Sequence, residues 1–163
     1  MQEFTPNTIL TSILYHNTPA ATAQIRGNAN HPDLFGTVSF YTTPLGGVLV
    51  SAEMYGMPAS DFYGMHIHEF GNCTPVSGGT AQPFSNAGGH YNPTNMPHPE
   101  HAGDLIPLLS NHGYAWTAVY TDRFRLPDII GRSVIVHGMR DDFTSQPAGD
   151  SGERIGCGVI NKV

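Results

Sequence analysis

The chain has 163 residues, enough for one domain of ordinary size, and it contains no run of about 18 apolar residues that would cross a bilayer. Its formal net charge is −6, with 7 Lys and Arg residues against 13 Asp and Glu residues, so the clustered cations that bind nucleic-acid phosphates are lacking. Composition therefore argues against nucleic acid and against a membrane span, and the 9 histidines are the unusual feature to explain.

Helix signals are weak along the whole chain. No window longer than about ten residues keeps an apolar period of three to four without Gly or Pro. The segment from Thr8 to Tyr15 could add one edge strand.

Strand signals are stronger and recur at short intervals. Runs rich in β-branched and aromatic residues, ended by turn residues, predict strands over 23–26, 34–42, 47–55, 62–70, 115–120, 133–137 and 155–160. In the third run, Val48, Val50, Ala52 and Met54 alternate onto one face. This pattern predicts an all-β sandwich or barrel.

Two long segments rich in Gly, Pro and Asn interrupt the strands, over residues 71–109 and 138–153. Structureless connections of this length inside a domain are usually functional or disordered. Because the first one contains three histidines, we expect it to be a functional loop.

The histidines are distributed as ligand pairs and clusters. His66 and His68 stand at positions i and i+2 of a predicted strand, so both imidazoles project from one face. His90, His98, His101 and Asp104 fall within fifteen residues of one loop, a donor set that suits Zn²⁺. His137 closes an apolar strand. Each feature also has a plain interpretation, as hydrogen-bonded or solvated histidines, and only their combination favours metal binding.

Three further motifs make the pattern specific. The segments 64–73 (GMHIHEFGNC), 131–137 (GRSVIVH) and 152–160 (GERIGCGVI) resemble the signatures of the copper–zinc superoxide dismutase family, in the family's order and approximate spacing. The resemblance covers roughly residues 22–162 and implies a domain over 22–163 after an N-terminal extension of residues 1–21. It also implies a Greek-key β-barrel of about eight strands, similar to an immunoglobulin-like sandwich, with two long functional loops.

The resemblance implies a role for each site residue. Copper would be bound by His66, His68, His90 and His137, and zinc by His90, His98, His101 and Asp104, with His90 bridging the two ions as an imidazolate. Arg154 would guide the superoxide anion, and His90 would also transfer a proton. Asp141 would orient one copper and one zinc histidine. Cys73 and Cys157, which the residues alone leave open between free thiols and a disulfide, would form a disulfide.

The implied activity is conversion of superoxide to dioxygen and hydrogen peroxide by a copper ion that cycles between Cu(II) and Cu(I), with a zinc ion beside it. His98 and His101 are separated by only two residues, closer than is usual in the family, so a copper-only enzyme stays an alternative. A non-catalytic dismutase-like domain that binds metal or docks a partner is the second alternative. A zinc hydrolase is disfavoured, because no carboxylate is placed as a general base beside an open zinc position.

Partners and location are less constrained by the sequence. We expect superoxide as the substrate, no nucleic-acid partner and no membrane association, and a homodimer is left open. The predicted disulfide and a single lysine favour a periplasmic or extracellular location, although the cytoplasm is not excluded.

Overall fold

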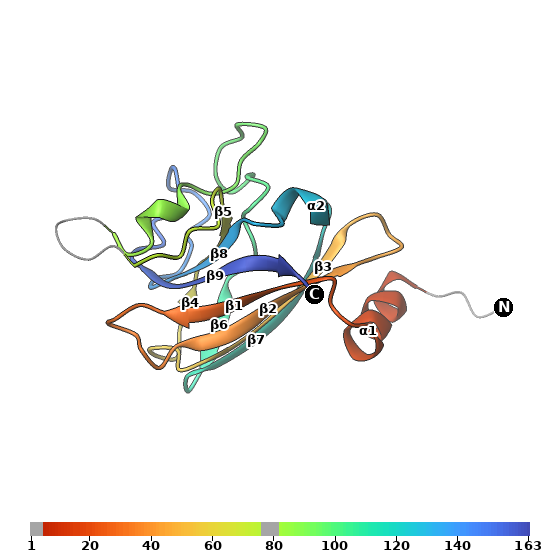
Figure 1. The fold of residues 1–163 in the computed structure, drawn as a ribbon, viewed down its shortest axis with the longest axis horizontal. Helices are drawn as coiled ribbons and strands as arrows, with labels where there is room; N and C mark the ends of the chain where they lie inside the picture. Colours follow the sequence, from red (N-terminus) through yellow and green to blue (C-terminus); the bar gives the residue numbers. More distant parts are fainter. Residues whose placement is uncertain (1–4, 76–81) are drawn as a thin grey trace.

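Nine strands form a nearly closed antiparallel barrel in a computed structural model of the chain, which describes residues 5–75 and 82–163 (Figure 1). The strands are β1 (Ala21–Gly27), β2 (Phe35–Thr42), β3 (Val48–Tyr55), β4 (Phe62–Tyr63), β5 (Met65–His68), β6 (Leu108–Asn111), β7 (Tyr114–Thr121), β8 (Ser133–His137) and β9 (Arg154–Lys162). Their hydrogen-bonded order is β4-β6-β7-β3-β2-β1-β9-β8-β5. The barrel confirms the predicted all-β fold.

The chain itself closes the barrel. β4 and β5 stand at opposite ends of the strand order, yet only Gly64 separates them in the sequence. β3 pairs with β7, and β1 pairs with β9, so connections cross between non-consecutive strands. Gly64 also splits the strand that was predicted as one run over 62–70.

The barrel core follows the predicted alternation. Val48, Val50, Ala52 and Met54 of β3 are all buried and belong to one hydrophobic cluster. Ile67 of β5 is also fully buried in this cluster, between the two histidines of that strand. Burying a side chain of this size stabilises the fold by roughly 1.5–3 kcal/mol.

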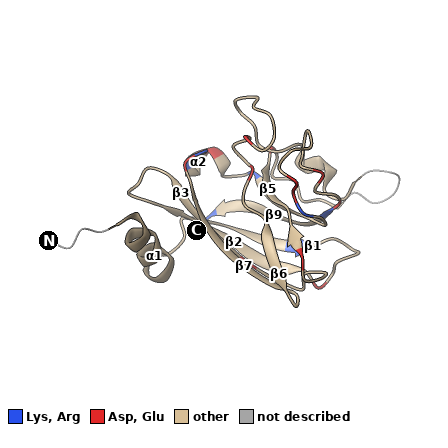
Figure 2. Cartoon of the chain, turned by 180° about the vertical axis from the view of Figure 1, so that it is seen from behind, with Lys and Arg blue, Asp and Glu red and all other residues tan. Residues whose placement is uncertain are grey.

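The expectation of an edge strand over residues 8–15 is wrong, because this segment forms helix α1 (Pro6–His16). Thr5 caps its N-terminus by accepting a hydrogen bond from the Thr8 amide, and Pro6 fits the first helical turn. Ile9 and Ile13 lie one turn apart on its partly buried side, a helical period that the polar pair at 11–12 obscures. α1 lies at the end of the barrel where the C-terminus emerges (Figure 1) and carries no charged Asp, Glu, Lys or Arg (Figure 2).

Other elements were absent from the sequence-based expectation. β6 lies at the end of the segment that was assigned to a loop over 71–109, and the short elements α2 (Leu126–Ile129) and η1 (Ser85–Ala87) were not predicted. β1 begins at Ala21, and the division of the chain at residue 22 stays a prediction. Among the described residues, no helix has the length and apolar character needed to cross a bilayer.

Candidate metal centre

Four buried histidines meet on the outside of the barrel. His66 and His68 come from β5, His137 from the end of β8, and His90 from the long loop between β5 and β6. One ring nitrogen of each lies within 4.8 Å of the corresponding nitrogens of the other three. Because Ile67 points into the core, the neighbouring His66 and His68 point to the opposite face, as the strand period requires.

The long loop is fixed to β5 by its backbone. The Ile67 amide donates to the Gly103 carbonyl at 2.9 Å, and the Tyr91 amide donates to the Ile67 carbonyl at 2.8 Å. Single β-bridges also place His90 beside His68 and Asp104 beside His66. These contacts bring loop residues that are far along the sequence next to the strand that carries the first two histidines.

A second group shares His90 with the first. His90, His98, His101 and Asp104 each offer a donor atom within 4.8 Å of the others. The Asp104 carboxylate lies 2.8 Å from His90 Nδ1, 3.0 Å from His98 Nδ1 and 3.2 Å from His101 Nδ1. The structure therefore brings His98 into the cluster despite its short separation from His101.

Asp141 connects the two groups from behind. Its Oδ2 lies 2.7 Å from His66 Nε2, and its Oδ1 lies 2.8 Å from His98 Nε2. When each Nε2–H donates to this carboxylate, the Nδ1 lone pair of each ring faces its cluster. One buried carboxylate thus fixes the tautomer of one histidine in each group.

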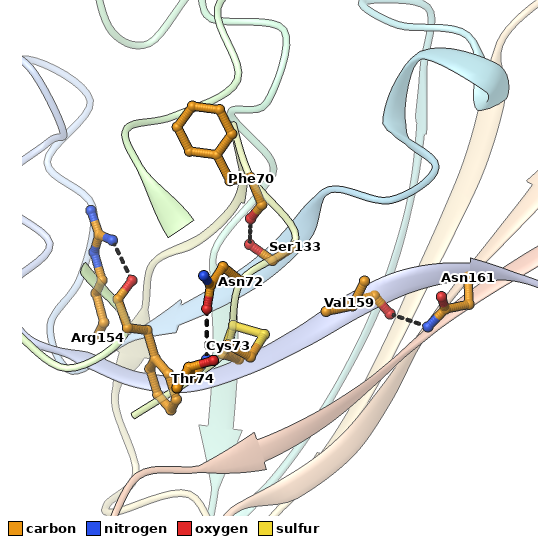
Figure 3. Close-up of a disulfide and its surroundings, with 10 residues drawn as sticks. Phe70, Asn72, Cys73, Thr74, Ser133, Arg154, Val159 and Asn161 are labelled. Carbon is orange, nitrogen blue, oxygen red and sulfur yellow. Dashed lines mark hydrogen bonds between the residues drawn. A yellow bond between two sulfur atoms is a disulfide. The ribbon is translucent and has the colours of Figure 1, made fainter. Parts of the chain in front are cut away.

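The Gly88 carbonyl plays a similar part on the other side of the first group. It lies 3.0 Å from His68 Nδ1, and it also accepts a hydrogen bond from Arg154 Nη2 at 2.7 Å. Arg154 Nη1 donates to the Phe84 carbonyl at 2.8 Å (Figure 3). These bonds hold the guanidinium against the loop and leave His68 Nε2 directed at the histidine group.

A disulfide fastens the same loop to the last strand. Cys73 is bonded to Cys157 of β9, with the two Cα atoms 5.6 Å apart (Figure 3). Phe84, Ala87, Ile135 and Cys157 form a small buried cluster around it. The predicted disulfide is confirmed, and it lies close to the loop carbonyls that hold Arg154.

The donor atoms fit metal ions better than they fit hydrogen bonding alone. His66 Nδ1 and His90 Nε2 are buried without a hydrogen-bond partner among the described residues, and each faces the group of His66, His68, His90 and His137. A buried polar atom without a partner costs roughly 1–3 kcal/mol, which a bound cation would offset. Histidine nitrogens suit both copper and zinc, and the added carboxylate suits zinc.

Burial also keeps these imidazoles in the state that binds metal. Burial, reinforced by neighbouring imidazoles, lowers the pKa of His66 and of His68 well below the ordinary value. The same causes lower the pKa of His137 to about 3. Burial raises the pKa of Asp104, but the hydrogen bond with His90 and nearby imidazoles outweigh it, so the net shift is downward. Neutral histidines facing an ionised carboxylate are the protonation states that metal ligation requires.

Comparison with known proteins decides the family. The model of the family "Copper/zinc superoxide dismutase" matches residues 34–160. The chain belongs to this family. Its members' activity is therefore the activity of this enzyme, and copper and zinc are its cofactors.

Individual relatives agree with this membership. A "Superoxide dismutase [Cu-Zn]" of Deinococcus radiodurans is 35% identical over 144 residues, which cover 78% of each chain. An "Extracellular superoxide dismutase [Cu-Zn]" of Rattus norvegicus is 30% identical over 80% of this chain and 56% of its own. The solved structure of the Cu/Zn superoxide dismutase from Brucella abortus superposes with a TM-score of 0.74 at 31% identity, covering 85% of this chain and 98% of its own.

The dismutase site opens to solvent through a cleft of about 940 Å³. His68, His90, His137 and Arg154 line it. Among the described residues that line the cleft, Arg154 is the only Arg or Lys, and Glu69, Asp150 and Glu153 are acidic. Among the described lining side chains, Arg154 is therefore the one permanent positive charge.

Two side chains that the sequence analysis did not single out hold the loop beside the group of His90, His98, His101 and Asp104. The Gln146 side chain accepts from the His98 amide at 2.9 Å and donates to the His98 carbonyl at 2.8 Å. Arg123 donates to the Pro99 carbonyl at 2.7 Å. No sequence motif marks either residue, because each contact depends on the path of two loops through space.

Gly149 is a third residue that the sequence analysis did not single out. A side chain at this position would disturb the contact between Asp141 and His98. Its φ is +66°, and an added Cβ would lie 2.0 Å from Asp141 Oδ1 and 2.7 Å from His98 Nε2. We expect Gly149→Ala to weaken zinc binding by about tenfold, through loss of roughly 1–2 kcal/mol of ligand orientation. Zinc affinity is measured by competition with a chromogenic chelator.

Gly46→Ala is the matched control for this prediction. Gly46 also has a positive φ, at +91°, but an added Cβ would meet nothing within 4 Å. Both variants carry the backbone strain of a left-handed conformation, of order 1 kcal/mol, whereas only Gly149→Ala displaces a carboxylate. Equal zinc affinities for the two variants would contradict the prediction.

The buried histidines also predict how the metal-free protein responds to acid. The unfolded imidazoles take up protons below a pKa of about 6.5, whereas the folded ones of His66, His68 and His137 stay neutral. The unfolded state then binds more protons, so stability falls as pH decreases below about 6.5, by up to roughly 1.4 kcal/mol per pH unit for each histidine.

Urea unfolding of the chelator-treated protein between pH 7 and pH 5 measures this loss of stability. His137→Gln removes one of the three groups, and we expect its stability to fall less steeply with pH than that of the unmodified protein. Identical slopes for the two proteins would show that His137 does not contribute.

Proposed function

We propose that this chain dismutates superoxide at the floor of the cleft, with copper and zinc held side by side. Copper would be held by His66, His68, His90 and His137, and zinc by His90, His98, His101 and Asp104. The observation that carries the proposal is the presence of two four-donor groups that share one imidazole, His90, with its Nδ1 on the Asp104 side.

Copper, when bound, supplies the one-electron exchange that superoxide needs for both its oxidation and its reduction. The protein's part is to bind the anion and to provide a proton. One turnover consumes two superoxide anions and two protons, and it yields one dioxygen and one hydrogen peroxide.

Arg154 is the residue that we assign to anion binding. Two of its N–H groups donate to the Phe84 and Gly88 carbonyls, and a guanidinium has five such donors. The remaining donors lie in a cleft lined by four of the histidines, where they are available to a small oxyanion.

His90 is the residue that we assign to proton transfer. Its Nε2 is buried and faces His66, His68 and His137, while its Nδ1 lies beside Asp104. His90 Nε2 would hold a proton and deliver it to the peroxide that becomes hydrogen peroxide. Water supplies the second proton. Zinc, which has no redox chemistry, would keep the imidazole oriented between these two roles.

The decay of superoxide measured with purified protein tests this function. The metal-free protein is reconstituted with copper, with and without zinc. We expect fast decay that requires copper, and higher stability or activity when zinc is added. If copper alone gave full activity, and added zinc changed neither the stability nor the activity, the copper-only alternative would hold. If fully copper-loaded protein did not accelerate decay, the chain would be a metal-binding domain without turnover.

The single cation in the cleft carries a prediction about ionic strength. With one arginine among three acidic lining residues and a net charge of −6 before metal binding, the side chains attract the anion only weakly from a distance. We therefore expect kcat/KM to fall by less than about twofold between low and physiological salt, whereas steered association falls steeply. Stopped-flow decay of superoxide over this range provides the measurement, and a tenfold fall would contradict the prediction.

We also propose that the protein works outside the reducing cytosol, in a periplasm or beyond the cell. The disulfide between Cys73 and Cys157 supports this, as does the extracellular relative described above. A homodimer remains a prediction, and sedimentation of the metal-loaded protein tests it.

A further inference from the structure

A row of aromatic side chains crosses the outer face of the barrel on β2, β3 and β7. The strand register places Phe35 opposite Tyr55, and Tyr55 opposite Tyr114. The ring centroids are 5.1 Å apart for the first pair, which is stacked, and 5.3 Å apart for the second. Trp116 follows on β7, and the four side chains are 40–55% exposed. Aromatic side chains are unusual in such a solvent-facing row.

Glu53 holds the middle of this row in place. Its Oε1 accepts one hydrogen bond from the Tyr55 hydroxyl at 2.9 Å and another from the Tyr114 hydroxyl at 3.0 Å. Glu53 also stands opposite Trp116 in the register of β3 and β7. One carboxylate therefore fixes two rings and lies beside a third, so the row is a preorganised surface.

The row continues into a groove between α1 and the sheet. The groove has a volume of about 420 Å³, within the range of small-ligand sites. Trp116 forms part of its wall, and the other polar lining groups are hydroxyls and one carboxylate, from Tyr15, Thr37, Ser39, Tyr41, Ser51 and Glu53. The described lining contains no Lys or Arg.

We propose that the aromatic row and this groove bind a neutral oligosaccharide. A sugar ring presents C–H groups on its faces, which pack on aromatic rings, and hydroxyls at its edges. The lining hydroxyls both donate and accept hydrogen bonds, and Glu53 adds an acceptor. With no cation in the described lining and one carboxylate, the groove disfavours an anionic ligand, whereas the same carboxylate can accept hydrogen bonds from the hydroxyls of a neutral one.

The size of the exposed aromatic surface argues against a protein partner. Aromatic side chains bury about 150–250 Å² each, so four that are half exposed offer roughly 300–500 Å². A stable protein interface needs about 800 Å² on each partner. The flanking groove is lined by hydroxyls, which a dry protein interface would leave unpaired, whereas a sugar would pair with them.

The proposed site is separate from the metal centre. In the strand order, β1 and β9 lie between the three strands of the aromatic row and the strands that carry His66, His68 and His137 (Figure 1). The two proposals can therefore fail independently. Changes in the row are expected to leave superoxide decay unchanged.

The fluorescence of Trp116 tests the proposal directly, because it is the only tryptophan in the chain. The metal-loaded protein is titrated with cellohexaose, chitohexaose and maltohexaose. We expect at least one of them to shift or quench the emission in a saturable way. Tyr55→Ala is expected to weaken that binding by about tenfold or more, equivalent to 1.4 kcal/mol.

The control variant is Phe62→Ala, which removes a similarly exposed aromatic ring from β4, outside the row. It is expected to bind as the unmodified protein does. No change in emission up to millimolar concentrations of all three sugars would overturn the proposal, as would binding that Tyr55→Ala leaves unaffected. Sedimentation is run in parallel, and self-association that Tyr55→Ala abolishes would identify the row as a contact between copies instead.

Discussion

Replacement of Asp141 by Asn is expected to lower zinc affinity by about 10–100-fold. The carboxylate accepts from His66 Nε2–H and His98 Nε2–H through separate oxygens. An amide has only one oxygen, so its NH₂ group would face one imidazole N–H, donor against donor. The displaced ring would either rotate or change tautomer, and its Nδ1 lone pair would no longer face the cluster.

The experiment compares zinc and copper affinities of the variant by chelator competition, with circular dichroism to verify folding. Asp142→Asn is the matched control, because Asp142 is the neighbouring acid and, in the part of the chain that the structure describes, its carboxylate bonds only to Thr144 and Ser145. We expect its affinities to equal those of the unmodified protein. If Asp141→Asn also bound zinc normally, the carboxylate would not be what orients His98.

Removal of the disulfide has the second largest expected effect. In the variant with Cys73→Ser and Cys157→Ser, the unfolded chain regains the freedom of a loop that spans 84 residues. The chain-entropy model then predicts a loss of roughly 4–5 kcal/mol in the free energy of unfolding. This is a large share of the 5–15 kcal/mol that stabilises a typical domain.

Urea unfolding of the metal-free proteins measures this loss without the contribution of bound metal. Unmodified protein treated with a reductant serves as the control, and it is expected to unfold at the same urea concentration as the variant. A loss of less than about 1 kcal/mol would mean that the unfolded chain keeps this region compact, contrary to the entropic account.

The barrel was predictable wherever one face of a strand is buried. In β3, four alternating apolar residues indicated a half-buried strand, and all four are in the core. β6 escaped prediction because it has only four residues, two of which pair with β4. α1 escaped prediction because its single buried residue, Ile13, gives too weak a period to recognise in a short helix.

The two groups of candidate metal ligands were predictable, because histidine and aspartate donors are chemically distinctive and their order along the chain resembles that of a known family. The residues that hold those donors in position could not be predicted from the sequence. Gln146 reaches His98 through backbone groups, which every residue has, and any polar residue at 146 would look the same in the sequence. Gly149 is required by the space beside Asp141, which exists only once both loops are folded.

Ile67 fills the barrel interior while the imidazoles on either side of it face outward. The hydrophobic core and the metal centre therefore lie on opposite sides of β5. The loop that completes the centre contributes to both sides, because Tyr91, Ala102 and Leu105 belong to the hydrophobic cluster. A change of length or sequence beside His90, His101 or Asp104 would consequently also disturb the packing of the interior.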